Sequence, residues 1–415
     1  MNNKIIWLIN PAAMPPYYEQ RIQTLKRAQY LQRKGFQVHI ITGSYLHNTS
    51  INLISDNSLF IDKVYDGTNY THIRTINYGN SYILRIYSLI SFYLSLFTII
   101  KLKTKPDFIS LYAAIPFSNI VYFFAKKYNC KLILDVVDLW PESLVELGLI
   151  SKYSPLLRLG YIAEKWMYNK ADIIVFSMEG GKDYIIEKKW DIDSGGTINL
   201  NKVKYINNGV DLYDFNSNLK KFEIKDSDLE NKNLFKVVYI GSIRFANGVE
   251  LLLDAAKHLS NIKDIKFLVY GSGPERIKIQ NRIKEESIDN VILKQEWVEL
   301  KYVPYILSKS SLNMLNYAKS KIWRFGGSQS KSFQYMASGK PIISNIEMSY
   351  CPIKKYNLGI SKDFSNSKEY ADAILYIYSL GKRDYDELCN NSLAASEKYN
   401  YENLTNLYIS QCLHY

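Results

Sequence analysis

The sequence predicts an α/β protein of two domains, each built around a parallel sheet. At 415 residues the chain is long enough for two domains that each bury a core of their own. Residues 5–9, 19–34 and 37–42 have the patterns of a strand, a helix and a strand, a βαβ unit whose strands should pair in parallel. A second alternation restarts with an apolar strand at residues 236–240.

The composition is that of a folded protein with a basic surface. Hydrophobic residues make up 47% of the chain and charged residues 22%, which excludes disorder. The formal net charge of +12 suits nucleic acid, phosphorylated substrates or an anionic membrane surface. The basic residues are spread over both halves without an aromatic-and-basic motif, so we expect no nucleic-acid partner.

The cysteines and the start of the chain indicate a cytoplasmic protein. The four cysteines are scattered without a close pair, which argues against a zinc site or a disulfide framework. A single lysine precedes a short apolar run that ends at Asn10 and Pro11, a pattern that favours a first strand over a secretion signal. The five histidines never approach metal-ligand spacing, so we expect neither a metal nor a cofactor.

An uncharged stretch at residues 86–100 suggests a membrane contact. Arg85 precedes it, and Lys101, Lys103 and Lys105 follow it. The stretch is too short to span a bilayer, which needs about 20 apolar residues. A buried core helix and a helix in the membrane interface are both compatible with it, and the lysines favour an anionic surface nearby.

Three acidic residues follow the apolar strand at residues 131–134. Asp135, Asp138 and Glu142 fall at the carboxyl edge of the predicted sheet, where ligands of such folds bind. Converging carboxylates could hold a metal ion. The plainer interpretation is that Asp138 caps the next helix while Trp140 packs against the sheet.

Residues 325–343 have the outline of an anion site. A glycine loop leads into a short helix, and the unpaired amides and positive dipole end of a helix start favour an anion. Lys331 in the first turn is unfavourably placed for that dipole unless an anion offsets it. An ordinary loop-to-helix junction with a solvated lysine is the alternative. The loop and the expected helix entry consist of Gly326, Gly327, Ser328 and Ser330.

This stretch resembles the donor-binding segment of the family 4 glycosyltransferases of GT-B fold, in particular the bacterial capsule and O-antigen branch. The pattern there is roughly Y-G-x-S-P-N-K-L-F-E/D-Y-M-A-x-G-K-P. The matching residues are Gly326, Ser328, Lys331, Phe333, Tyr335, Met336, Ala337, Gly339, Lys340 and Pro341. The departures are Gln329, Ser330, Ser332 and Gln334, in place of a proline, an asparagine, a leucine and an acid. Many members carry a glutamate where this chain has Gly326, so both donor-site acids are missing.

The resemblance implies two Rossmann-like domains with parallel sheets facing a central cleft. Its further motifs are residues 66–85, the D-L-W-P-E-S run that starts at Asp138, and an N-G-V-D segment at residues 208–211. The acceptor domain would span residues 1–208, completed by a C-terminal helix at about 396–415. Residues 209–395 would form the nucleotide-sugar domain, and the polar run up to Lys232 would be a flexible hinge.

The resemblance also implies a donor site in the second half. The loop from Gly241 to Gly248 retains one cation, Arg244, which we expect to contact the diphosphate because a guanidinium can donate twice to phosphate oxygens. The G-x-G-P motif of Gly271 and Gly273 would lie close to the donor. Main-chain groups around Trp297 and Val298 would pair with uracil. Gln334 can still accept a hydrogen bond in place of the missing acid.

On the acceptor side we expect Arg21, Tyr112 and Asp138. Arg21 lies one turn beyond the first loop and could contact an acceptor phosphate, although a surface role is equally compatible. The catalytic residues are predicted to be Asp138, Glu142, Arg244 and Lys331.

The implied function is that of a retaining, metal-independent hexosyltransferase at the inner face of the plasma membrane. It would move an N-acetylated hexosamine or a deoxyhexosamine from a UDP-sugar to a lipid-linked saccharide of the undecaprenyl diphosphate type, in capsule or O-antigen biosynthesis. Two other classes stay open. A GT-B sugar-nucleotide epimerase would need acids and histidines around the donor, and a catalytically weak, membrane-docked scaffold would fit the missing glutamates.

Overall fold

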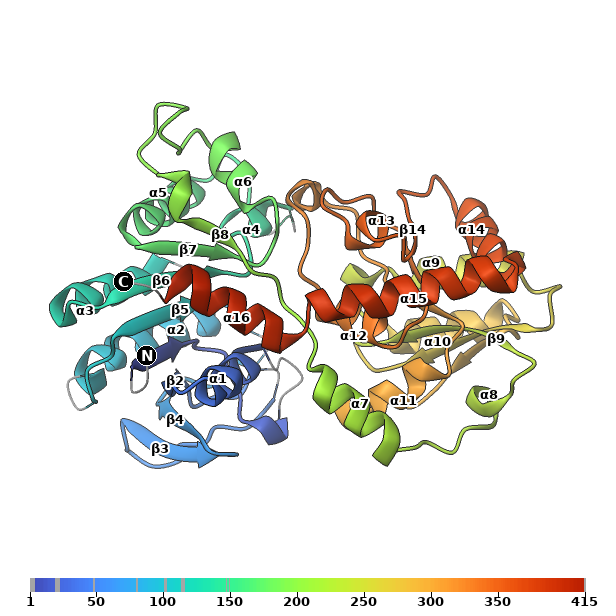
Figure 1. Ribbon diagram of the computed structural model, residues 1–415, viewed down its shortest axis with the longest axis horizontal. Helices are drawn as coiled ribbons and strands as arrows, with labels where there is room; N and C mark the ends of the chain where they lie inside the picture. Colours follow the sequence, from blue (N-terminus) through green and yellow to red (C-terminus); the bar gives the residue numbers. More distant parts are fainter. Residues whose placement is uncertain are drawn as a thin grey trace. The chain divides into compact units, whose positions relative to one another are not determined.

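The chain folds into two compact units (Figure 1). The computed structural model describes residues 4–18, 23–47, 49–79, 81–100, 103–112, 116–146, 148 and 150–413. Unit 1 comprises Met1–Asn207 and Leu404–Tyr415, and unit 2 comprises Asn208–Asn403. The chain therefore returns to unit 1 at Leu404 and not at about residue 396, because α15 (Lys382–Lys398) packs against α12 (Ser330–Ala337) of unit 2.

Unit 1 contains an eight-stranded sheet in the order β3-β4-β2-β1-β5-β6-β7-β8. All neighbouring strands pair in parallel except the β3–β4 hairpin. The central strands are almost continuously apolar and buried, as expected for a parallel sheet covered on both faces. The strands are β1 (Ile5–Ile9), β2 (Gln37–Gly43), β3 (Phe60–Tyr65), β4 (Thr68–Ile73), β5 (Phe108–Tyr112), β6 (Lys131–Val136), β7 (Ile173–Phe176) and β8 (Val203–Tyr205).

The helices of unit 1 include the uncharged stretch, which lies in α2. One side of α2 is buried through Phe92, Leu96 and Ile99, whereas Ile83 and Leu94 on the other side are 67% and 63% exposed. The buried side agrees with a core helix, and contact of the exposed apolar side with a membrane stays a prediction. No helix in the described ranges is both long and apolar enough to cross a membrane. The helices are α1 (Gln23–Arg33), α2 (Tyr82–Ile99), α3 (Ile120–Tyr128), α4 (Glu142–Glu146), α5 (Pro155–Lys170), α6 (Gly181–Glu187) and the end of α16 (Tyr401–Cys412).

Unit 2 contains a six-stranded, fully parallel sheet in the order β11-β10-β9-β12-β13-β14. The strands are β9 (Phe235–Ile240), β10 (Ile265–Tyr270), β11 (Val291–Leu293), β12 (Leu312–Met314), β13 (Ile342–Ser344) and β14 (Gly359–Ser361). The helices are α7 (Leu212–Lys221), α8 (Ser227–Glu230), α9 (Val249–His258), α10 (Arg276–Glu285), α11 (Val303–Ser308), α12, α13 (Pro352–Lys355), α14 (Ser367–Ser379) and α15.

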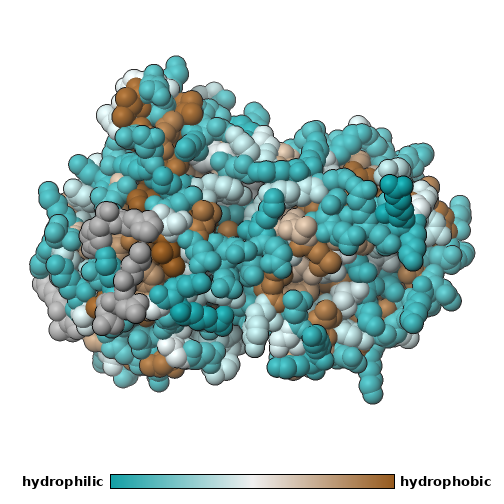
Figure 2. All heavy atoms as spheres, in the orientation of Figure 1, coloured by the Kyte–Doolittle hydropathy of each residue, from teal (hydrophilic) through white to brown (hydrophobic). Residues whose placement is uncertain are grey.

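The core of unit 2 consists of two clusters, one on each face of the sheet. Along β10, Phe267 and Val269 belong to one cluster, and Leu268 and Tyr270 belong to the other. This alternation follows from the two-residue period of a strand and places helices on both faces. The outer surface is mostly hydrophilic with scattered apolar patches on the face shown in Figure 2.

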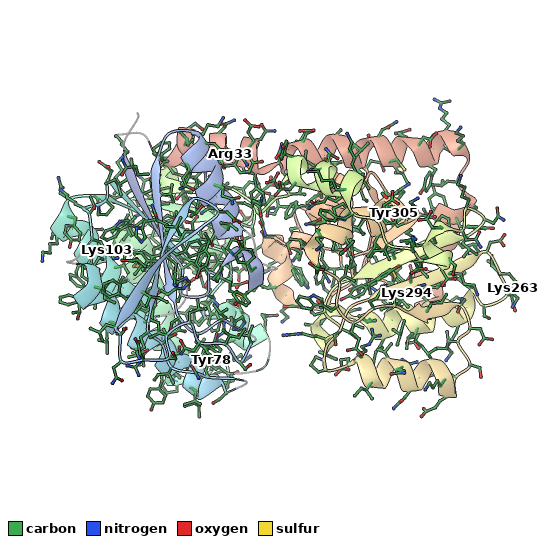
Figure 3. The ribbon with its side chains drawn as sticks, turned by 90° about the horizontal axis from the view of Figure 1, so that it is seen from below. Arg33, Tyr78, Lys103, Lys263, Lys294 and Tyr305 are labelled. Atoms are coloured by element: carbon green, nitrogen blue, oxygen red, sulfur yellow. The ribbon has the colours of Figure 1, made fainter. Side chains whose placement is uncertain are left out.

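The expected flexible hinge is wrong for most of residues 208–232. Asp211 caps α7 and Asp226 caps α8 through their side chains. Asp226 also binds Lys294 at 2.7 Å, which fixes this segment on unit 2. Lys294 is labelled among the side chains in Figure 3. The polar residues that suggested a linker are therefore helix caps and ion-pair partners.

Candidate functional site

The start of α12 is a helix end without a side-chain cap. Its N-cap is Gln329, whose side chain makes no capping hydrogen bond. We expected the helix to begin through Ser328 and Ser330, and the structure places the N-cap between these two serines. Ser328 instead accepts a hydrogen bond from the Asn208 amide at 3.3 Å. The comparable start of α14 is capped by the side chain of Asn366. A helix start without such a cap leaves backbone donors available to an anion.

Lys331, the second residue of α12, lies over the loop that begins at Gly241. A Cβ atom at Gly241 would lie 3.1 Å from its Nζ. The Nζ atom lies 3.3 Å from the Tyr239 hydroxyl and 4.7 Å from the centre of that ring. The Tyr239 hydroxyl donates to the Ser242 carbonyl at 2.6 Å, so it accepts from Lys331. Tyr317 presents its ring 5.9 Å from the same ammonium.

The electrostatics of Lys331 favour an anionic ligand. It forms no ion pair with a carboxylate of any described residue. Burial alone lowers its pKa from the ordinary value of 10.5 to about 8. Lys331 is half-buried, and the partners described for its ammonium are a hydroxyl and two aromatic rings. Its charge is poorly compensated, and an anion bound there would stabilise it.

The two glycine loops of unit 2 are packed backbone against backbone. A Cβ atom at Gly271 would lie 1.9 Å from the Gly241 carbonyl oxygen, and one at Gly273 would lie 2.3 Å from the Ile243 oxygen. Ile243 donates its amide to the Ser272 oxygen at 2.8 Å. Gly271 and Gly273 therefore hold the Gly241 loop in place under Lys331.

Two arginines lie at these loops and have different roles. Arg244 is exposed, precedes the short helix η5 (Phe245–Asn247), and forms no ion pair with a described residue. Arg276 donates to the oxygens of Gly271 and Lys294 at 2.6 and 2.8 Å. Arg276 thus stabilises the second loop, whereas Arg244 is open to a ligand.

The remaining predicted donor residues lie on the same unit. Gln334 follows Lys331 by three positions on α12, so both lie on one side of the helix. Trp297 is 67% exposed, and Val298 packs against a core cluster. Gly326 has a φ of +83°, a conformation that favours glycine, and a Cβ atom at Gly327 would lie 2.5 Å from Gln329 Nε2.

On unit 1, Tyr112 and Asp138 lie at one edge of the sheet. Tyr112 ends β5, Asp138 follows β6, and these strands are neighbours. Arg21 lies outside the described residues. Glu142 is buried, accepts a hydrogen bond from Tyr161 and pairs with Lys188 at 2.5 Å. The Glu142 carboxylate therefore links the start of α4 to Lys188 at the end of α6, an ion pair within unit 1.

The structure also separates the three acids that a metal would need together. Asp135 pairs with Arg27 at 2.6 Å and accepts a hydrogen bond from Ser110, and the Arg27 guanidinium lies 4.6 Å from the centre of the Tyr408 ring. Sequence reasoning missed this buried group because its members come from distant parts of the chain. Within the described ranges, no cluster of His, Cys, Asp or Glu side chains could hold a metal ion.

The comparison with protein families concerns the second unit. Residues 220–392 match the family described as glycosyl transferases group 1. This segment of unit 2 is therefore similar to the group 1 glycosyltransferases. Its uncapped helix start and Lys331 both fall inside the matched segment.

Solved structures resemble the whole chain in fold. Sucrose-phosphate synthase from Thermosynechococcus elongatus covers 99% of this chain and 98% of its own at 16% identity, with a TM-score of 0.70. The E. coli trehalose-6-phosphate protein bound with UDP-2-fluoro glucose covers 98% of each chain at 9% identity, with a TM-score of 0.72. Anabaena HepE in complex with UDP and glucose covers 99% of each chain at 12% identity, with a TM-score of 0.62. No curated protein matches the sequence. These likenesses confirm the GT-B fold.

Within the matched segment, sequence reasoning missed the aromatic residues around the Lys331 ammonium. Tyr239 lies one position before the end of β9, and Tyr317 follows β12. Both tyrosines lie at or just after the carboxyl end of a strand, the edge that carries the glycine loops. That position was the signal in the sequence that could have marked them as site residues. Only the fold shows that both rings face Lys331.

Proposed function

We propose that this protein is a retaining glycosyltransferase that moves a hexosyl unit from a UDP-sugar to a saccharide acceptor. The observation that carries the proposal is Lys331, an ammonium without a carboxylate partner beside an uncapped helix start in a group 1 glycosyltransferase domain. Such a site suits the negative charge that develops on a departing nucleoside diphosphate.

The reaction breaks the bond between the sugar C1 and the diphosphate oxygen. The acceptor hydroxyl forms the new C1–O bond on the same face of the sugar, and its proton passes to the leaving phosphate oxygen. In this scheme Lys331 and Arg244 stabilise the diphosphate, and neither a protein base nor a metal is required. The exposed indole of Trp297 and the main chain at Val298 are proposed to hold the uracil.

We further propose a lipid-linked saccharide as the acceptor, because unit 1 has an exposed apolar face. The helices of this face are connected through the short helix η3 (Pro116–Asn119), which contacts α2, α3 and α5. Exposed lysines and arginines, Lys126, Lys127 and Arg158 among them, accompany it. The exposed apolar residues are Ile83, Ile86, Tyr87, Leu94, Phe97, Phe117, Phe123, Leu156, Leu159 and Ile162. This combination suits an anionic membrane surface. The N-acetylated or deoxy character of the sugar and the capsule or O-antigen pathway rest on the motif resemblance alone.

The experiment that tests the donor site is a thermal-shift series with UDP, GDP and ADP and their common sugar conjugates. We expect a stabilisation specific to UDP compounds, since a ligand at a hundred times its Kd adds about 2.7 kcal/mol. Lys331→Ala should abolish this stabilisation, and in a turnover assay it should raise the barrier of the sugar-transfer step by about 2 to 4 kcal/mol.

Lys368→Ala is the matched control, because Lys368 is also the second residue of a helix that begins with serine. It should keep the wild-type shift. If no nucleotide stabilises the wild-type protein, the glycosyltransferase proposal is wrong and a scaffold role is favoured.

A further inference from the structure

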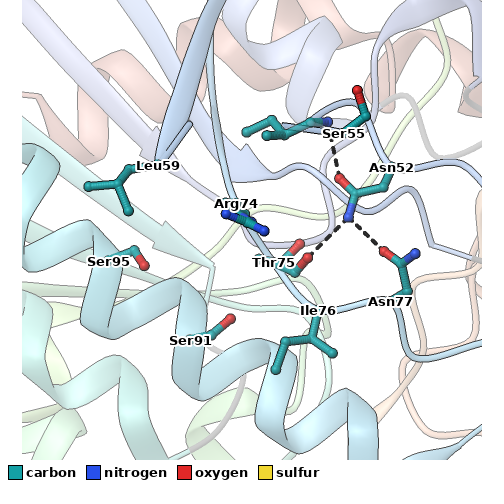
Figure 4. A pocket seen from close by; sticks show the side chains of 10 residues that line it. Asn52, Ser55, Leu59, Arg74, Thr75, Ile76, Asn77, Ser91 and Ser95 are labelled. Atoms are coloured by element: carbon teal, nitrogen blue, oxygen red, sulfur yellow. Dashed lines mark hydrogen bonds between the residues drawn. The ribbon is translucent and has the colours of Figure 1, made fainter. Parts of the chain in front are cut away.

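Unit 1 contains a pocket that the donor chemistry does not use. Its volume is about 580 Å³, within the range of small-molecule sites (Figure 4). It is formed by the segment after β2, the segment directly after β4, and one side of α2. The lining residues are Asn52, Ile54, Ser55, Leu59, Arg74, Thr75, Ile76, Asn77, Ser91 and Ser95.

The lining contains hydrogen-bond donors and one cation, but none of its residues is acidic. The guanidinium of Arg74 is exposed and forms no ion pair with a described residue; its one side-chain contact is with the Asn57 oxygen at 3.5 Å. The pKa of Asp56 lies below its usual value, mainly because Asp56 accepts hydrogen bonds from Ser58. The charge of Arg74 contributes less to this lowering. The pocket therefore favours a ligand rich in oxygen atoms and negatively charged.

Part of the lining is fixed by hydrogen bonds. Asn52 donates to the Thr75 carbonyl at 3.1 Å and to Asn77 Oδ1 at 2.6 Å, which sets the orientation of the Asn77 amide and leaves its Nδ2 without a described partner. Ser95 on α2 also has no hydrogen-bond partner among the described side chains, and Ser91 donates to the Ser88 carbonyl. These groups are available to the hydroxyls of a bound molecule.

The position of the pocket relates it to the acceptor side. Residues 74–77 follow β4 directly, so the pocket lies at the same carboxyl edge of the sheet as Tyr112 and Asp138. Ser91 and Ser95 flank Leu94, which belongs to the exposed apolar face. A ligand in the pocket would thus lie next to the face proposed to contact the membrane.

We propose that this pocket binds an anionic saccharide, a sugar unit that carries a phosphate or carboxylate group, as part of the acceptor. The assignment to the acceptor rests on the proposed transferase function. Arg74 would bind the anionic group, and Asn77 and Ser95 would bind ring hydroxyls. The apolar side chains of Leu59 and Ile76 would contact the C–H face of the sugar.

Calorimetric titration of the full chain with glucose 1-phosphate, glucose and inorganic phosphate tests the pocket. We expect glucose 1-phosphate to bind more tightly than either fragment. Arg74→Ala should weaken its binding at least about tenfold, because a hydrogen bond to a charged group is lost. Ser95→Phe should abolish it by filling the pocket, and Arg33→Ala, an exposed arginine on α1, should leave it unchanged. Equal affinity in all four proteins would overturn the proposal.

A second measurement distinguishes the source of the saccharide. UDP release is followed with either a free sugar phosphate or a prenyl-diphosphate saccharide in vesicles as the acceptor. With the true acceptor, Arg74→Ala should raise KM at least about tenfold while kcat changes little. An unchanged KM with both acceptors would contradict the role in the acceptor site. Lys331 is intact in every protein that is titrated, so the change caused by Arg74→Ala reports on the pocket alone. Failure of the transferase proposal and failure of the pocket can therefore be told apart.

Discussion

At the scale of single residues, Lys331 relates structure to function most directly. The folded protein lowers its pKa to about 8, whereas the unfolded chain has the ordinary value of 10.5. Between these values the unfolded state binds more protons than the folded state, so stability from this group rises with pH across that window. Below about pH 8, Lys331 stays protonated in the folded protein, and its positive charge is poorly compensated. This charged form is the one suited to bind a diphosphate.

Binding of UDP should therefore weaken as the pH rises through about 8. The ammonium form binds the diphosphate, so loss of its proton should reduce the affinity by up to about tenfold per pH unit. Titrations between pH 7 and 9.5 check this. The Lys331→Met protein should bind weakly and without that step, and an identical pH profile in both proteins would show that another group is responsible.

At the scale of elements, the glycine loops after β9 and β10 determine the shape of the proposed donor site. Gly271 has a φ of +129° and lies against the Gly241 carbonyl. Gly271→Ala should cost more than about 2 kcal/mol of stability, because backbone strain and overpacking add. It should also abolish the stabilisation by UDP, since the loop beneath Lys331 must move.

Gly381→Ala provides the comparison. Its φ is −62°, and a Cβ atom there meets nothing within 4 Å. Thermal unfolding of this protein should match the wild type or exceed it slightly. Equal unfolding temperatures for the two alanine proteins would show that the two loops are not rigidly packed.

At the scale of the whole molecule, the exposed apolar face of unit 1 bears on localisation. Flotation with vesicles should recover the protein with anionic lipids and recover less with neutral lipids or at high salt. The double change of Ile83 and Leu94 to glutamate should abolish recovery. Ile277→Glu, at an exposed position of unit 2, should not. Lys103 contributes little to this attraction, because it pairs with Asp62 at 2.5 Å. Absence of binding to anionic vesicles would remove the membrane from the proposal.

The sequence by itself determined the fold and predicted the centre of the proposed donor site. Apolar runs bounded by glycine or proline located β1, β2, β9 and β10, because parallel strands buried on both faces leave a continuous apolar signal. The glycine loop, the helix start and Lys331 are local in sequence, so their spacing predicted an anion site. Segments 66–85 and 138–143 matched motifs of the resemblance, but the motifs did not predict how their side chains are arranged.

Only the tertiary structure decided which charges are compensated. Asp135, Glu142 and Lys331 all looked available in the sequence, yet the first two have partners more than forty residues away and the third has no carboxylate. The polar run after Asn208 looked like a hinge and forms capped helices instead. Pairing and burial depend on which distant segments meet, and no local pattern of residues contains that information.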